Sequence, residues 1–163
     1  MIDLTPLPRA IAPRVLVARP YATSLRDRVS SVLTKIGLDI EGGELIPSGT
    51  PDDEAIEAIV ASRCDVLLIP FNAHRGPDGN LLDGLTLCRR LTAHPQASSR
   101  PVLMPVSRMA AANLRLTSHA GEHASHNTEL LDTQILVIED DDVEEVETTK
   151  RIRDHLRTHG IRV

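Results

Sequence analysis

Short apolar runs alternate with amphipathic stretches along almost the whole chain. The apolar runs, rich in Val, Ile and Leu, lie at residues 14–18, 38–49, 65–71, 99–107 and 133–140. The stretches that repeat apolar residues at helical spacing lie at 24–37, 50–64, 83–94, 107–116 and 142–160. Continuous apolar runs of this length are typical of strands buried on both faces of a parallel sheet. The alternation predicts an α/β fold, a doubly wound five-stranded parallel sheet with right-handed crossovers and the flavodoxin-like strand order 2-1-3-4-5.

Residues with strong positional preferences mark the ends of the expected helices. Ser24 is the expected N-cap of the first helix, and Gly37 ends it. Thr50 or Pro51 occupies the cap of the second helix, which opens with acidic residues. The last helix also has acids at its start and bases at its end, and Gly160 stops it. These signals fit helices that each pack one apolar face on the sheet.

The length of 163 residues is near the common size of one domain. Residues 1–13 contain three prolines and no periodic pattern, so we expect an extended N-terminal tail. Residues 14–163 are then expected to form a single domain, in which 118–133 are a polar, His-rich connection. The second strand is the weakest of the five, because Gly42 and Gly43 interrupt it.

Composition narrows the class of protein further. The hydrophobic fraction of 41% is ample for a core, but Tyr21 and Phe71 are the only aromatic residues, so aliphatic side chains must fill it. A formal net charge of -5 argues against direct nucleic-acid binding, which would need a basic face. Cys64 and Cys88 lack metal-ligand spacing and fit a reduced, cytoplasmic protein. With no signal peptide and no membrane-length apolar run, we expect a cytoplasmic domain that does not contact a membrane.

Residues 65–106 carry a resemblance to a known family. There an apolar strand, a helix opened by "DGL", the sequence "CRRL", a helix ending near "HPQ" and the strand "PVLMPV" follow in order. In these features, and in its layout from Arg14 to Gly160, the chain resembles the receiver domains of response regulators. The resemblance implies a phosphorylation pocket at the carboxyl edge of the sheet. In that pocket two acids after the first strand and an acceptor aspartate after the third hold Mg²⁺, while a hydroxyl after the fourth strand and a lysine after the fifth contact the phosphoryl group.

The chain departs from this pattern at every one of those places. Arg19 and Pro20 stand where the family has its acid pair, and Pro70 stands at the acceptor position. Val106 takes the hydroxyl position, and Glu139 stands near the lysine position, where a carboxylate would repel a phosphoryl group. So many losses in one pocket predict that the aspartyl-phosphate chemistry is gone.

Several nearby residues could compensate in part for these losses. Ser107 follows Val106 and could supply a hydroxyl group. The loop at 71–82 is longer than the family's usual connection, so Asp78 or Asp83 could reach the pocket, although a loop is a poor place to fix a metal ligand.

The last thirty residues admit three interpretations. "ILVIEDD" followed by a helix can be the fifth strand and last helix, with its acids stabilised by the helix macrodipole. It also resembles the start of a receiver, with Glu139 and Asp140 as the family's metal-binding acids, so a permuted receiver with this strand at its centre is a second interpretation. The third is a tandem arrangement cut short. The first needs the fewest assumptions.

"HAGEHASH" places His119, His123 and His126 four and three residues apart, so that on a helix their rings would share one face. Such a face could bind a transition metal such as zinc. The alternative is a polar linker, which Gly121 and the small residues around it favour.

The leading hypothesis for function is a pseudo-receiver, a phosphorylation-independent protein-interaction module of two-component signalling with no enzymatic activity and no cofactor. Its partner is a second copy of the chain or another protein. The last two helices and the strand between them are the expected surface, with Met109, Ala110, Leu114 and Leu116 as candidate contacts. The alternatives are an atypical receiver that binds Mg²⁺ or phosphate through Glu139 and Asp140, and a small-ligand sensor that uses the same sheet edge.

Overall fold

The computed structural model describes residues 12–18, 23–47, 49–71, 74–75, 81–96, 99–107 and 134–163. The main sheet consists of β1 (Arg14–Ala18), β2 (Asp39–Ile46), β3 (Val66–Leu68), β6 (Val102–Val106) and β7 (Ile135–Glu139). The helices are α1 (Thr23–Ile36), α2 (Asp52–Ala61), α3 (Gly84–Thr92) and α5 (Val146–Thr158), with a 3₁₀ turn at Asp140–Asp142. Among the described residues, no helix has the length and hydropathy needed to cross a membrane.

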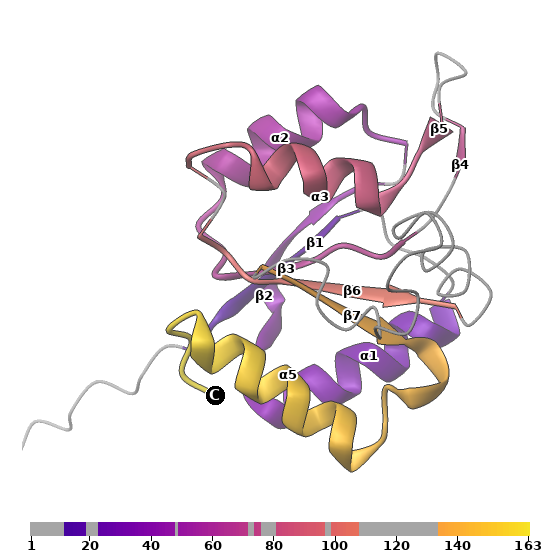
Figure 1. Ribbon diagram of the computed structural model, residues 1–163, viewed down its shortest axis with the longest axis vertical. Helices are drawn as coiled ribbons and strands as arrows, with labels where there is room; N and C mark the ends of the chain where they lie inside the picture. The colour runs from indigo at the N-terminus through magenta and orange to yellow at the C-terminus, as the bar shows by residue number, and fades with distance from the viewer. Residues whose placement is uncertain are drawn as a thin grey trace, which may run out of the picture.

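The five strands of the main sheet run parallel in the order β2-β1-β3-β6-β7. With β6 and β7 as the fourth and fifth strands, this is the predicted order 2-1-3-4-5, which is confirmed. Helices α2 and α3 cover one face of the sheet, and α1 and α5 cover the other (Figure 1). Because β7 lies at the edge beside β6, the interpretation of a permuted receiver with this strand at the centre is wrong.

Four of the strands, β1, β3, β6 and β7, are buried on both faces along nearly their whole length, as their continuous apolar runs predicted, whereas the edge strand β2 is largely exposed. Along β1, Leu16 faces the core beneath α2 and α3, whereas Val15 and Val17 face the core beneath α1 and α5. This alternation follows from the two-residue period of a strand. Cys64 and Cys88 are both buried free thiols in the first of these two layers.

The helix ends agree with the sequence signals at three positions. Gly37 and Gly160 follow the ends of α1 and α5 with φ angles of 112° and 80°, which a side chain would disfavour. Pro51 is the N-cap of α2, one of the two residues expected there. The prediction for Ser24 is wrong, because α1 begins at Thr23 and Ser24 therefore lies inside the helix.

The last helix begins later than its sequence predicted. The acids Asp140–Asp142 form a 3₁₀ turn, and α5 starts only at Val146, after the N-cap Glu145. Val143 is buried in the core between the turn and the helix. The chain bends inward to bury this side chain before the helix begins, so Asp140–Asp142 lie ahead of the helix, and the acid in its first turn is Glu147.

The second strand is continuous, although its sequence predicted an interruption. Its pairing with β1 shifts, since Arg14 pairs with Asp39 but Leu16 pairs with Glu44, so β2 carries extra residues in a bulge. A side chain at Gly43 would overlap the carbonyl oxygen of Val15. The glycines therefore allow β2 to bulge against β1 without breaking the strand.

The connection at 71–82 contains structure that the sequence did not predict. Two short strands, β4 (His74–Arg75) and β5 (Leu81–Leu82), pair antiparallel, with His74 opposite Leu82 and Arg75 opposite Leu81. The interpretation of this whole segment as a loop is therefore wrong. The tail expected at 1–13 lies outside the described residues, apart from residues 12 and 13.

Candidate functional site at the carboxyl edge of the sheet

The carboxyl ends of the parallel strands meet at one edge of the sheet, which is where open α/β folds place their ligands. Pro70 follows β3 and is buried, Val106 is the last residue of β6, and Glu139 is the last residue of β7. Arg19 and Pro20, which directly follow β1 in the sequence, lie outside the described residues. Three of the predicted pocket positions are thus found at the ends of adjacent strands.

Pro70 ends the pairing between β3 and β1. The N–H groups of Leu67, Ile69 and Phe71 all donate to β6, at 3.0, 2.9 and 3.0 Å. Because successive residues of a parallel strand point to opposite neighbours, a donor at position 70 would point toward β1. Proline has no N–H, and the β1–β3 register stops at Val17 and Leu68.

A second proline, Pro105, removes a ladder donor on the other side of β3, although its carbonyl oxygen still accepts from the N–H of Phe71. The N–H of Val102 donates to Gln134, just before β7, so a donor at position 105 would point the opposite way, toward β3. The β3–β6 register stops at Leu68 and Leu103. The two prolines remove ladder donors from both sides of the central strand at its carboxyl end. Prolines are rare at interior sheet positions for this reason.

Helix α3 packs tightly against the end of β3. A side chain at Gly84 would overlap the carbonyl oxygen of Pro70, so only glycine allows this approach. The preceding Asp83 caps the helix, since its carboxylate accepts hydrogen bonds from the N–H of Thr86 at 2.6 Å and from the Thr86 hydroxyl at 3.0 Å. The structure thus shows Asp83 as the cap of α3, and Asp78 lies outside the described residues.

The position of the expected hydroxyl is apolar and buried. Val106 is 1% exposed and belongs to the core layer beneath α2 and α3. Ser107, which could have substituted, is exposed just beyond the end of β6. Val106 therefore supplies no hydroxyl group at this edge, and the hydroxyl-bearing Ser107 lies on the surface of the domain.

Two acids lie at the end of the edge strand. Glu139 pairs in register with Val106 and is half-buried. Asp140 opens the 3₁₀ turn that follows. Glu139 ends β7 and Asp140 follows it, so this pair would have to bind a metal from the edge of the sheet, without a side-chain ligand from Pro70 after β3.

The described residues at this edge do not fit the magnesium site that the resemblance implies. Mg²⁺ takes oxygen ligands in near-octahedral geometry, but Pro70 and Val106 carry no side-chain oxygen. Within the described ranges, no group of three or more His, Cys, Asp or Glu side chains lies close enough to hold a metal ion. We therefore derive no chemical step through magnesium.

The remaining predicted site residues lie outside the described part of the chain. They are the histidines His119, His123 and His126, and the expected interface residues Met109, Ala110, Leu114 and Leu116. Both hypotheses stay predictions. The sequence analysis did not identify Pro105 as a residue of this edge. The available signal was the proline inside "PVLMPV", because proline is rare within an interior strand.

Comparison with known proteins shows similarity in structure. No protein-family model matches the sequence, and no curated protein matches it. Among solved structures, a sensor protein from Polaromonas sp. JS666 aligns with a TM-score of 0.55 at 17% identity, covering 93% of this chain and 99% of that one.

Two further solved structures are a putative response regulator and a receiver domain. A putative response regulator from Chloroflexus aurantiacus J-10-fl aligns with a TM-score of 0.50 at 20% identity, covering 89% of this chain and 98% of that one. The receiver domain of a sensor histidine kinase from Pseudomonas aeruginosa PAO1, solved with a magnesium ion coordinated in its active-site cleft, aligns with a TM-score of 0.51 at 15% identity, covering 92% and 99%.

These similarities extend over nearly the whole length of each chain, and they agree with the order of the strands. At identities this low they establish the fold. The chain therefore has the flavodoxin-like fold of response-regulator receiver domains.

Proposed function

We propose that this chain is a pseudo-receiver, a protein-interaction module in signalling that works without aspartyl phosphorylation. The observation that carries the proposal is Pro70, buried at the end of the central strand where the resemblance puts the acceptor aspartate. Proline has no nucleophilic atom, so a phosphoryl group cannot be transferred to this position. The fold is kept while the reacting side chain is missing, which favours a role carried by shape and surface.

The hydrogen bonds around Pro70 support this proposal. An aspartate at position 70 would bring an N–H group pointing toward β1, where none is present now. The approach of Gly84 to the carbonyl oxygen of Pro70 also fixes the start of α3 at this place. The strand end is therefore built around proline and a close helix, not around an exposed carboxylate.

The interaction role rests on the surface near the start of α5. Val146, in the first turn of this helix, is 86% exposed, which is unusual for a large apolar side chain. It lies on the expected interaction surface of the last two helices and the strand between them. A second copy of this chain or another signalling protein would cover it, and no catalytic step is required of the domain.

Phosphorylation is tested by incubating the protein with acetyl phosphate and Mg²⁺ and measuring its intact mass. A receiver that carries the acceptor aspartate serves as the positive control. We expect no gain of a phosphoryl group and no binding of beryllofluoride, since position 70 has no acceptor. Stoichiometric incorporation of a phosphoryl group would overturn the proposal, and loss of that signal in Glu139→Gln would point to the rearranged acidic pocket.

The interaction surface is tested by substituting exposed apolar residues and measuring molar mass by light scattering over a concentration series. Val146→Glu is expected to weaken dimer formation or capture of a purified partner. The matched control is Leu45→Glu, since Leu45 is 60% exposed on the edge strand β2, which α5 does not cover. Equal effects of the two substitutions would mean that α5 is not the interaction surface.

A further inference from the structure

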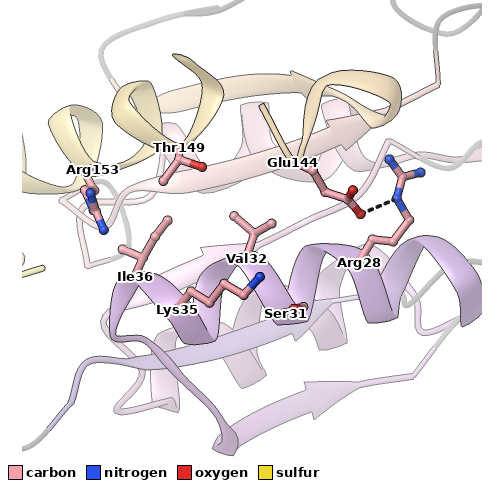
Figure 2. A pocket seen from close by; sticks show the side chains of 8 residues that line it. All are labelled: Arg28, Ser31, Val32, Lys35, Ile36, Glu144, Thr149 and Arg153. Atoms are coloured by element: carbon pink, nitrogen blue, oxygen red, sulfur yellow. Dashed lines mark hydrogen bonds and ion pairs between the residues drawn. The ribbon is translucent and has the colours of Figure 1, made fainter. Parts of the chain in front are cut away.

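A hollow between α1 and α5 lies on the face of the sheet opposite α2 and α3 (Figures 1 and 2). Its volume is about 430 Å³, which is enough to receive side chains from another molecule. Val32 and Ile36 of α1 form the apolar part of its lining, and Thr149 and Arg153 line it from α5. We call this hollow the α1–α5 groove.

The two ends of the α1–α5 groove hold different parts of its helices. Arg28 and Glu144 form an ion pair at one end, with Nε and Oε1 3.0 Å apart, and Ile36 and Arg153 lie toward the other (Figure 2). Arg28 lies early in α1 and Glu144 lies just before α5, so the two helices run in the same direction along the groove. One end of the groove therefore holds the starts of both helices, and the other holds later residues of both.

The end with the helix starts is acidic and carries an exposed apolar side chain. Glu145 and Glu147, both exposed, flank Val146, which is 86% exposed. Val146 lies three residues before Thr149 and seven before Arg153, so it continues the row of α5 side chains that line the groove. The helix macrodipole accounts for acids at the start of α5, but it does not account for the exposed valine between them.

The other end of the groove is basic. Lys35 and Arg153 are both exposed, and neither forms an ion pair with another residue in the described part of the chain. The apolar Val32 and Ile36, 7% and 6% exposed, lie between these two cations and keep them apart (Figure 2). An apolar side chain with a carboxylate on each side matches this arrangement, and Val146 with its neighbours is such a group.

We propose that the α1–α5 groove is the contact surface of a symmetric dimer of this chain. A twofold axis across the middle of the groove places the acidic start of α5 of each copy on the basic end of the other. Val146 then packs on the partner's Val32 and Ile36, and the two carboxylates beside Val146 pair with the partner's two cations. This dimer rests on the interaction role proposed above and names a second copy of the chain as the partner.

Charge complementarity favours a second copy over an unrelated protein. The acidic and basic ends lie on one face in opposite order, so a twofold rotation brings unlike ends together in two places at once. Each contact is therefore formed twice, and small individual contributions add. The formal net charge of -5 opposes arrangements of two copies that do not pair opposite charges.

The first test is sedimentation equilibrium over a concentration series from micromolar to millimolar. We expect a monomer–dimer equilibrium whose dissociation constant rises about tenfold between ionic strengths of about 0.05 M and about 0.5 M, because salt screens exposed ion pairs. A chain that stays monomeric at millimolar concentration, or a dimer indifferent to salt, would overturn this dimer. The pseudo-receiver role is judged separately, by the acetyl phosphate experiment.

The decisive test mixes two charge-reversed variants. One carries Glu145→Lys and Glu147→Lys, and the other carries Lys35→Glu and Arg153→Glu. Each variant alone is expected to dimerise about tenfold more weakly or worse, because like charges then face each other twice. In an equimolar mixture the new lysines of one variant meet the new glutamates of the other, and the unchanged ends also meet, so we expect a heterodimer with nearly the original affinity. A mixture that stays monomeric, with both variants folded by circular dichroism, would overturn the proposal.

A single substitution tests the apolar contact. Val146→Ser should leave the stability of the single chain unchanged, since Val146 is exposed there, but raise the dissociation constant of the dimer about tenfold. Arg89→Glu is the matched control for charge, because Arg89 is an exposed residue of α3, on the opposite face of the sheet, and its reversal should leave dimerisation unchanged (Figure 1). An unchanged dissociation constant in Val146→Ser, or equal weakening by Arg89→Glu, would overturn the proposal.

Discussion

The two edges of the sheet are built differently. At the amino edge, side chains join the strand starts to the helices. The Arg100 guanidinium donates to the carbonyl oxygens of Ile59 and Ser62 at the end of α2, at 2.6 and 3.1 Å. The Gln134 amide donates to the carbonyl oxygen of Arg100 at 2.6 Å, and His155 Nε2 donates to the carbonyl oxygen of Gln134 at 2.9 Å. A chain of hydrogen bonds thus links α2, β6, β7 and α5.

The carboxyl edge loses hydrogen bonds where the amino edge adds them. Pro70 and Pro105 each remove a ladder donor beside β3, so that beyond Leu68 the hydrogen bonds to β6 are donated by Ile69 and Phe71 alone, to Leu103 and Pro105. The amino edge therefore has side-chain hydrogen bonds that join strands to helices, whereas the carboxyl edge lacks two ladder donors beside its central strand.

The largest expected effect is at the amino edge. Arg100→Met removes the charge-assisted hydrogen bonds that satisfy the last carbonyl groups of α2. We expect the free energy of unfolding to fall by about 3 kcal/mol, because hydrogen bonds to charged groups are the strong ones and the carbonyls are left part-buried. Urea denaturation measures this change. Arg63→Met, at an exposed arginine nearby, is the control and should change stability by less than about 0.5 kcal/mol.

The second largest effect is expected where Gly84 lies against the carbonyl oxygen of Pro70, at the carboxyl edge. Gly84→Ala places a methyl group against the carbonyl oxygen of Pro70, so α3 or the end of β3 must shift. We expect a loss of about 2 kcal/mol by urea denaturation, as for other overpacked sites. Gly49→Ala provides the comparison, since Gly49 has a φ of 83° in open space and its substitution costs only backbone strain of about 1 kcal/mol. A cost at Gly84 no larger than that at Gly49 would show that α3 adjusts freely.

Much of the fold could be predicted from the sequence, because strands buried on both faces leave an unmistakable apolar run. The runs at 65–71 and 133–140 correspond to β3 and β7, and strand order followed from the regular alternation with helices. The errors have local causes. The bulge of β2 and the delayed start of α5 depend on contacts with Val15 and the core around Val143, which no pattern within a single segment contains.

Individual residues of the site could be predicted from the sequence, but the hydrogen bonds between them could not. The sequence identified Pro70 as the residue at the end of the third strand, and the structure places it there. It did not reveal that Pro105 acts on the same strand, because that effect depends on which neighbour each N–H faces. The role of Asp83 as the cap of α3 was likewise not predicted, because it depends on where the helix begins.

The smallest expected effect on stability belongs to Pro105→Val, which would sharpen the comparison between the edges most directly. The new N–H points toward β3 and can donate to the carbonyl oxygen of Ile69. The hydrogen bond gains about 1 kcal/mol, but loss of proline's restraint on the unfolded chain costs a similar amount, about 0.4–1 kcal/mol. Hydrogen exchange is therefore the better measurement. We expect the amide at 105 to be protected like that of Val106, which points toward β7 by the same alternation. If it exchanged like an exposed loop amide, the missing hydrogen bond at this position would not be due to the proline, and the contrast between the two edges would have to come from the loops that follow the strands.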